Sequence, residues 1–277
     1  MTDGDTLPGG GATGLRTRFA GFVAPGLPPD RSDRLARALG LNPANGPADG
    51  LTGEPAGSGA LALLLTDGGA AEKESLWLPP VAAWVEPAAG DEDGGGVAAW
   101  LAEASGTDLY VNLTTATAHD LQLGGRLLTA IGARHPLSGH RRDDIELALH
   151  EAVSNALVHG NLGVGGMMEL SAQELERFSR ELGDGLADPV LAARRIAIAI
   201  RIDPPQAVPA GPGPAEGQPE DGRALATVEI TDQGAGFVPC RRERAGASGR
   251  GLDLIGSIAD GLEIEDGGRR IRLRFRL

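Results

Sequence analysis

Lysine and cysteine are almost absent from this chain of 277 residues, which contains one of each, Lys73 and Cys240. A single cysteine excludes an internal disulfide and any zinc site built from several thiolates. A phosphate loop of the P-loop type ends in a lysine, and Lys73 does not follow a glycine-rich loop. If the chain binds a nucleotide, another architecture must hold it.

Positive charge is also scarce, with 25 Lys and Arg against 38 Asp and Glu and a formal net charge of −13 at pH 7. This balance disfavours nonspecific DNA or RNA binding, because clustered cations supply most of that affinity. No apolar run approaches the roughly 20 residues that cross a bilayer. The start, MTDGDTLPGGG, is acidic and glycine-rich, unlike a secretion signal. We therefore expect a cytoplasmic protein that binds neither nucleic acid nor membrane.

Aromatic residues make up only 3% of the chain, whereas glycine (43) and proline (19) together exceed a fifth of it. Because 41% of the residues are hydrophobic, we expect part of the chain to fold and part to remain flexible. Residues 1–58 are predicted to be mostly flexible, apart from a helix over 30–41. Residues 59–106 contain short apolar runs and are predicted to form a small or degenerate N-terminal module.

Regular periodicity begins near residue 107. Alternation of apolar and polar residues predicts strands at 109–115, 194–202, 225–232 and 270–277. Apolar residues at helical spacing predict helices at 118–134 and 142–160, with a further helix within 167–186. Two segments interrupt this pattern: an insertion at 162–193, and a proline- and glycine-rich loop at 203–222 that we expect to be disordered.

On the second helix, Glu151, Asn155 and His159 recur every four residues and therefore share one narrow face. A carboxylate there can accept a proton from a hydroxyl group. The amide oxygen is a hard ligand, suited to a magnesium ion that also bridges phosphates. Taken alone, this pattern also fits the polar face of an ordinary amphipathic helix.

A second motif, DQGAGF (232–237), follows the strand LATVEIT. Gly234 and Gly236 let the backbone turn sharply and approach a flat ligand, beside Phe237. Asp232 is left at the end of the strand, where its carboxylate can accept from the exocyclic amine of adenine. The same residues are also common in ordinary turns after strands.

A third motif, SGRGLDLI (248–255), is a small-residue loop that leads into an apolar helix. Free backbone N–H groups at Gly249, Gly251 and Leu252 can meet phosphate oxygens at the positive end of that helix. Arg250 or Arg244 can add a guanidinium donor. A flexible connection before a helix would give a similar sequence.

Together, in this order and on these element types, HEAVSNALVHGN, DQGAGF and SGRGLDLI resemble the N box and the two glycine boxes of the GHKL ATPase superfamily. The resemblance covers about residues 107–277. It implies an α/β two-layer sandwich, with a mixed sheet covered on one face by helices, that binds ATP and Mg²⁺. By this resemblance, Glu151 is the general base, Asn155 the magnesium ligand, Asp232 the adenine reader, and Gly249 and Gly251 part of the phosphate lid. His159 is expected to be structural or to lie near the phosphates.

Within that superfamily, the compact strand–helix start is similar to the anti-sigma factor serine/threonine kinases of bacterial partner switching. This similarity implies phosphorylation of an anti-anti-sigma protein, sequestration of a sigma factor, or both. Gly160 and Asn161, in HGN, match a variant with an insertion after the N box. A nucleotide-dependent binding module without kinase activity and the ATPase half of a histidine kinase remain alternatives. His150 is expected to be a surface residue, and formation of a homodimer stays open.

Overall fold

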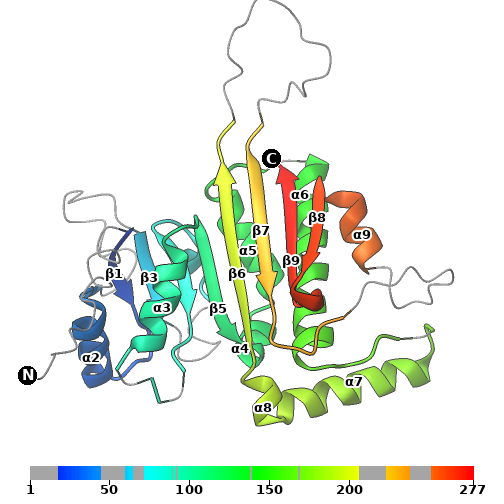
Figure 1. The fold of residues 1–277 in the computed structure, drawn as a ribbon, viewed down its shortest axis with the longest axis horizontal. Coiled ribbons are helices and arrows are strands. Elements are labelled where there is room, and N and C mark those ends of the chain that lie inside the picture. Colours follow the sequence, from blue (N-terminus) through cyan, green and yellow to red (C-terminus); the bar gives the residue numbers. More distant parts are fainter. Residues whose placement is uncertain are drawn as a thin grey trace, which may run out of the picture.

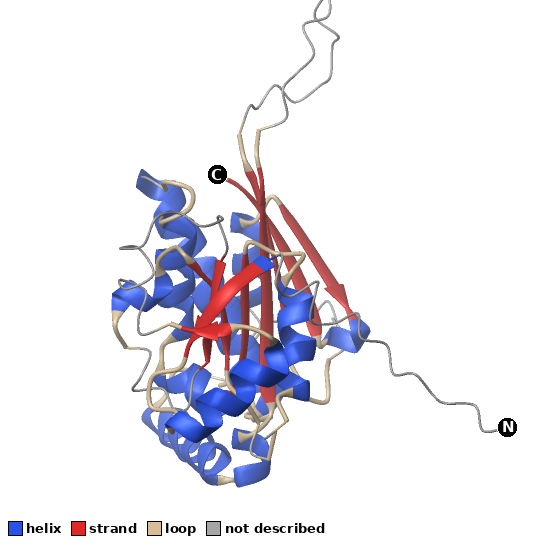
Figure 2. Ribbon diagram, turned by 90° about the vertical axis from the view of Figure 1, so that its left-hand side faces the viewer, coloured by secondary structure: helices blue, strands red, loops and turns tan. Residues whose placement is uncertain are grey.

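The computed structural model describes residues 18–44, 60–64, 72–88, 90–91, 93–137, 139–167, 169–205, 223–237 and 251–277 of the chain. Within these ranges, nine strands form one mixed sheet in the order β2-β1-β3-β4-β5-β6-β7-β9-β8 (Figure 1). Helices lie on both sides of the strands, with the larger group on one side (Figure 2). The α/β fold with a mixed sheet, predicted from the sequence, is confirmed.

The N-terminal half of the sheet is parallel. Its strands are β1 (Phe19–Val23), β2 (Asn42–Pro43), β3 (Ala60–Leu64), β4 (Val81–Val85) and β5 (Leu109–Thr114). One face of these strands packs against the helices α2 (Pro29–Leu39) and α3 (Gly95–Ala104). The opposite face joins the large core and is covered in part by the short helix η3 (Glu74–Trp77). Because both faces are covered, β3 and β4 consist of apolar residues throughout.

This arrangement differs from the expected organisation of residues 1–106. Residues 19–44 form a strand, a helix and a second strand. The helix agrees with the one predicted over 30–41, but the sequence indicated flexible chain on either side of it. Strand β4 pairs with β5, so the expected boundary at 106/107 does not coincide with a break in the sheet. The physical reason is burial: Phe19, Phe22 and Leu35 are 0% exposed within one cluster, despite the glycine- and proline-rich surroundings. Residues 1–17 and 45–59 lie outside the described residues.

The C-terminal half of the sheet is antiparallel and consists of β6 (Arg195–Asp203), β7 (Leu225–Thr231), β9 (Arg270–Arg276) and β8 (Gly261–Glu265). The strands predicted at 109–115, 194–202, 225–232 and 270–277 are confirmed as β5, β6, β7 and β9. Of the expected disordered loop at 203–222, residues 206–222 lie outside the described part of the chain.

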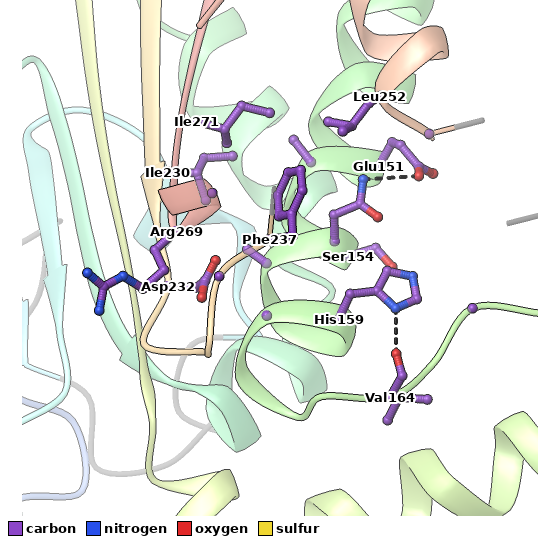
Figure 3. Close-up of a pocket in the computed structure, with 18 of the residues that line it drawn as sticks. Glu151, Ser154, His159, Val164, Ile230, Asp232, Phe237, Leu252, Arg269 and Ile271 are labelled. Carbon is purple, nitrogen blue, oxygen red and sulfur yellow. Dashed lines mark hydrogen bonds between the residues drawn. The ribbon is translucent and has the colours of Figure 1, made fainter. Parts of the chain in front are cut away.

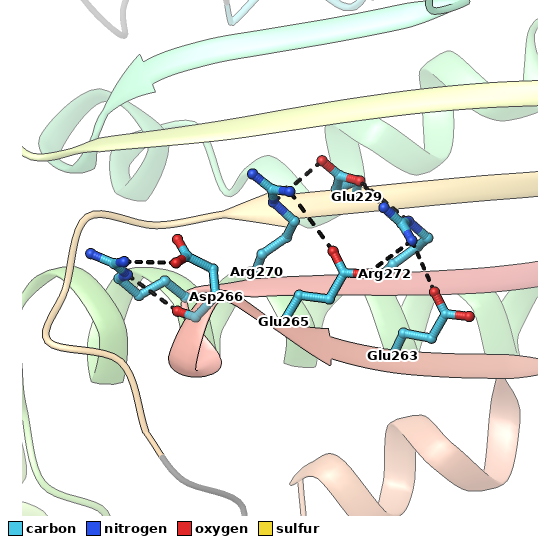
Figure 4. A network of polar contacts seen from close by, with 7 residues as sticks. Glu229, Glu263, Glu265, Asp266, Arg270 and Arg272 are labelled. Carbon is cyan, nitrogen blue, oxygen red and sulfur yellow. Dashed lines mark hydrogen bonds and ion pairs between the residues drawn. The ribbon is translucent and has the colours of Figure 1, made fainter.

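The outer face of this antiparallel half carries a ladder of charges (Figure 4). Arg272 pairs with Glu229 at 2.9 Å, Glu263 at 2.9 Å and Glu265 at 3.1 Å. Arg270 lies 3.6 Å from Glu229. The row of arginines on the last strand therefore faces acidic side chains of its own sheet, which balance much of its charge.

The helices of the large core cover the face of the antiparallel half that lies opposite the charge ladder. They are α4 (Thr115–Asp120), α5 (Leu123–Gly132), α6 (Gly139–Ser154), the π-helical turn η4 (Asn155–Asn161) and α9 (Gly251–Ile258). The helix predicted over 118–134 is broken, since Gln122 has a φ of 49° between two buried leucines, Leu121 and Leu123. The turn at Gln122 lets both leucines reach the core.

The insertion at 162–193 forms α7 (Ala172–Ala187) and α8 (Pro189–Ala192), which run along one end of the sheet (Figure 1). Ser171 is the N-cap of α7, and its side chain accepts from Glu174 N at 3.2 Å. Among the described residues, no helix is long and apolar enough to cross a membrane.

Candidate functional site

A cavity of about 520 Å³ lies between the helical layer and the antiparallel half of the sheet (Figure 3). Side chains from α6 and η4 form one wall, and residues from β7, β9 and the start of α9 form others. Most residues predicted for the site line this cavity; they are Glu151, Asn155, His159, Asp232, Gly236, Phe237, Gly251 and Leu252. The structure thus brings together segments that are up to about 100 residues apart in the sequence.

Glu151, Asn155 and His159 face the cavity from consecutive turns, as their spacing predicts. Asn155 Nδ2 donates to Glu151 Oε1 at 3.2 Å. His159 Nδ1 lies 2.6 Å from the carbonyl oxygen of Val164, which can only accept, so Nδ1 carries the proton. The helix widens into a π-helical turn from Asn155, a local change that often occurs at functional sites.

Asp232 lies at the end of β7, half-buried beside the last turn of η4. Its Oδ1 accepts from Gly234 N at 2.7 Å, which fixes the carboxylate in the turn. Burial raises the pKa of the Asp232 carboxyl, and the Gly234 hydrogen bond and the charges of Arg269 and Arg194 partly oppose that rise. An added Cβ at Gly160 would lie 2.6 Å from Asp232 Cγ, so only glycine fits there.

Phe237 is held over the cavity by the β8–β9 turn. Phe237 N donates to Gly267 O at 2.8 Å, and the residue is 43% exposed. Gly268 and Arg269 of the same turn line the cavity, together with Ile230 and Ile271 of the sheet. None of these four residues was predicted for the site, and for Gly268 and Arg269 the reason is that the turn meets DQGAGF through a tertiary contact. The alternation on strands β7 and β9 marked Ile230 and Ile271 only as inward-facing.

The start of α9 closes the opposite end of the cavity. An added Cβ at Gly251 would lie 1.8 Å from Glu151 Oε1, so the backbone at Gly251 packs directly on the carboxylate. Leu252 lines the cavity beside it. Gly249 and Arg250 lie outside the described residues, and their roles remain predictions.

The end of the N box is tied to the second motif by a buried amide. Asn161 is 0% exposed, and its Oδ1 accepts from Gln233 N at 2.7 Å. Its Nδ2 donates to Thr115 Oγ1 at 2.8 Å and to Arg195 O at 3.1 Å. These bonds fix the distance between the helix that carries Glu151 and the turn that carries Asp232.

The donor set fits a magnesium ion that is bound mainly by phosphate oxygens and water. Asn155 uses Nδ2 to hold Glu151, which leaves Oδ1 as the atom available to a metal ion. Among the described residues, no group of three His, Cys, Asp or Glu side chains could hold a metal ion by itself. A metal at Asn155 would therefore need ligands from a bound nucleotide.

His150 takes no part in this site. It is exposed on α6 and does not line the cavity, and its ring packs beside Gly124 and Gly125 of α5. Its position on the surface agrees with the sequence analysis.

The family model of the histidine kinase-like ATPase domain matches residues 114–275, more than half of the chain. The match spans all three motifs and begins at the last residue of β5. No curated protein matches the chain.

Proposed function

The chain belongs to the histidine kinase-like ATPase family, and on this basis we propose that it is an ATP-dependent serine/threonine kinase of the anti-sigma type. Its substrate would be a serine or threonine of an anti-anti-sigma protein, and a sigma factor would be a second partner. ATP binding follows from the family itself. The kinase type and the partners are the proposal.

The observation that carries the proposal is the hydrogen-bonded pair of Glu151 and Asn155. This pair lies at the end of the cavity that the start of α9 closes. In phosphoryl transfer, most of the catalysis comes from positioning and charge neutralisation. Asn155 Oδ1 would hold Mg²⁺, which neutralises charge on the phosphates. Glu151 would accept the proton of the attacking hydroxyl, with Asn155 Nδ2 fixing the orientation of its carboxylate.

At the other end of the cavity, Asp232 suits an adenine base. Its carboxylate keeps one oxygen on Gly234 N, which leaves the other oxygen to accept from an exocyclic amine. Guanine carries a carbonyl oxygen at that position and would face the carboxylate with a second acceptor. The site therefore favours ATP over GTP.

One contact favours a second candidate function, a nucleotide-dependent binding module without phosphoryl transfer. The backbone at Gly251 covers Glu151 Oε1, and the same atom already accepts from Asn155. A protein that kept this contact with nucleotide bound would hold ATP without offering its carboxylate to a substrate hydroxyl.

Radiolabel transfer from the γ-phosphate of ATP to a candidate anti-anti-sigma protein separates the two functions. We expect acid-stable label on the added protein, and Glu151→Gln should lower its rate by about 100-fold or more while ATP binding, measured by calorimetry, persists. Glu146→Gln is the matched control, because Glu146 lies on the same helix and pairs with Arg142 outside the cavity.

Transfer at the wild-type rate by Glu151→Gln would exclude Glu151 as the base. ATP binding with no transfer to any such partner would favour the binding module. Acid-labile label on the protein itself would instead indicate the ATPase half of a histidine kinase.

A further inference from the structure

The insertion at 162–193 contributes directly to the wall of the cavity. Val164, Gly166 and Met167 line it from the segment before α7, and Phe178 lines it from α7 itself. We call residues 162–167 the strap. In Figure 3, Val164 of the strap lies next to His159, on the side of the cavity away from the sheet.

The strap is tied to the N-box helix by backbone and side-chain hydrogen bonds. Leu162 N donates to Leu157 O at 2.9 Å, and Val164 N donates to Val158 O at 2.9 Å. The bond from His159 Nδ1 to Val164 O, at 2.6 Å, joins the strap to a residue of the cavity. The first half of the strap is therefore fixed by the helix that precedes it.

Apolar packing fixes α7 against the same segment. Phe178, Leu182 and Leu186 of α7 and Leu191 of α8 pack on the buried side chains of Val158, Leu162 and Val164. This small cluster is separate from the two larger cores of the described residues. It holds α7 beside the cavity without any contribution from the sheet.

Arg177 of α7 fixes the second half of the strap. Its Nη2 donates to Gly166 O at 3.1 Å. Glu174 accepts from Nε and Nη2 at 3.1 and 3.0 Å, and Glu181 accepts from Nη1 at 2.9 and 3.0 Å. The two carboxylates, three residues before and four residues after Arg177, hold the planar guanidinium in one orientation.

We propose that the strap is a part of the nucleotide site that faces the nucleoside, and that Arg177 is the residue that positions it. This inference rests on the proposed ATP binding. The N-box helix runs from Glu151, beside α9, to His159 and Gly160, beside Asp232, a distance on the order of 10 Å. Because the strap contacts His159, it lies at the end of the cavity where Asp232 would read the base, away from the phosphate end.

Arg177→Gln should therefore weaken adenosine, ADP and ATP by the same factor, about tenfold, in calorimetric titrations. An interaction made only with the nucleoside contributes equally to all three ligands. Arg177→Lys should recover part of the affinity, because its ammonium group can still donate to Gly166 O. The double variant Glu174→Gln/Glu181→Gln keeps the bond to Gly166 but loosens the guanidinium, so its loss should be smaller.

Arg180→Gln is the matched control, since Arg180 is exposed on the same helix. Titrations well below the thermal unfolding midpoint of each variant separate positioning from stability: a purely structural role would lower the midpoint and leave the affinities unchanged. Wild-type affinity in Arg177→Gln, or a loss confined to ATP, would overturn the inference while ATP binding itself stands. Absence of adenine nucleotide binding in the wild-type protein would overturn the proposed function, and this inference with it.

Discussion

The parallel strands β1 to β5 and the antiparallel strands β6 to β9 share one sheet but are buried in different ways. All five residues of β4 are buried, because side chains of this strand enter both of the separate cores on opposite faces of the sheet. In β7, buried and partly exposed residues alternate strictly. The antiparallel half thus leaves one face to solvent and to the charges of Glu229 and the arginines of β9 (Figure 4).

This difference separates the part of the sheet that lines the cavity from the part that does not. Strands β7 and β9 line the cavity, and no described residue of β1 to β5 does. The parallel half instead has the strand order 2-1-3-4-5, the order of flavodoxin-like sheets. Because β5 pairs directly with β6 along residues 109–114, we expect the two halves to stabilise one another and to unfold as one unit.

The largest effect should come from Trp84→Ala in the parallel half. Trp84 is 0% exposed, stacks on Trp77 with ring centroids 4.6 Å apart, and donates from Nε1 to Leu76 O at 2.9 Å. Loss of the ring should lower the free energy of unfolding by about 3–5 kcal/mol in urea titrations. Val190→Ala, at a side chain that is 71% exposed, is the control.

Two spectroscopic probes of the unfolding of Trp84→Ala test whether the two halves of the sheet unfold together. The three tryptophans of the chain, Trp77, Trp84 and Trp100, lie before β5, so fluorescence reports the parallel half and far-UV circular dichroism reports both halves. We expect the two transitions to coincide in the wild-type protein and to shift together in Trp84→Ala. A fluorescence transition that moves alone would mean that the halves unfold independently.

A smaller effect should follow from Arg195→Met, at the junction of the two halves. Arg195 Nη2 donates to Glu86 O at 2.6 Å and Asn112 O at 2.8 Å, Nε donates to Asn112 Oδ1, and the guanidinium lies 4.0 Å from the centroid of the Trp100 ring. Methionine removes the Arg195 donors from Glu86 O and Asn112 Oδ1, whereas Asn112 O still accepts from Glu86 N at 3.0 Å. We therefore expect a loss of about 2–3 kcal/mol in the free energy of unfolding.

Arg272→Met is the contrast in the antiparallel half. Its ion pairs lie on the solvent-facing side of the sheet, and such pairs contribute less than about 1 kcal/mol. Added salt should reduce that small effect further. If Arg272→Met cost as much as Arg195→Met, the outer face of the antiparallel half would not be open to solvent as described.

The same contrast explains which parts of the fold could be predicted from the sequence. Strands β6, β7 and β9 were predicted because one face is buried and the other is not, which gives a period of two. Strands β1, β3 and β4 are buried on both faces and show only short apolar runs such as VAAWV, which a sequence cannot distinguish from part of a helix. The break at Gln122 was missed because its positive φ falls on a glutamine, a residue that seldom adopts this conformation.

At the site, the predictable residues are those whose spacing lies within one element. Glu151, Asn155 and His159 share a helix face, so their meeting in one cavity could be expected from the sequence. Phe178 and Arg269 reach the same cavity through the packing of segments that are far apart in the chain. No local pattern encodes such contacts, and the roles of the predicted residues still await the experiments above.

The smallest effect on stability, and one of opposite sign, should come from Asp232→Asn in the antiparallel half. Burial places the pKa of the Asp232 carboxyl above the ordinary value of 3.8. The folded state therefore binds more protons than the unfolded state just above pH 3.8, and wild-type stability falls as the pH rises through the folded pKa. Asparagine keeps an acceptor for Gly234 N and does not titrate in this range.

Asp232→Asn should thus raise the thermal midpoint at pH 7, and the gain should shrink as the pH falls toward 3.8. Asp144→Asn, exposed on α6, should show no such trend. The same variant should weaken ATP binding, because the amide can present a donor to the exocyclic amine in place of the carboxylate oxygen. A lower midpoint at pH 7 would show that the ionised carboxylate stabilises the fold. A higher midpoint together with weaker ATP binding would show that the ionised Asp232 carboxylate lowers the stability of the antiparallel half while it contributes to recognition of the base.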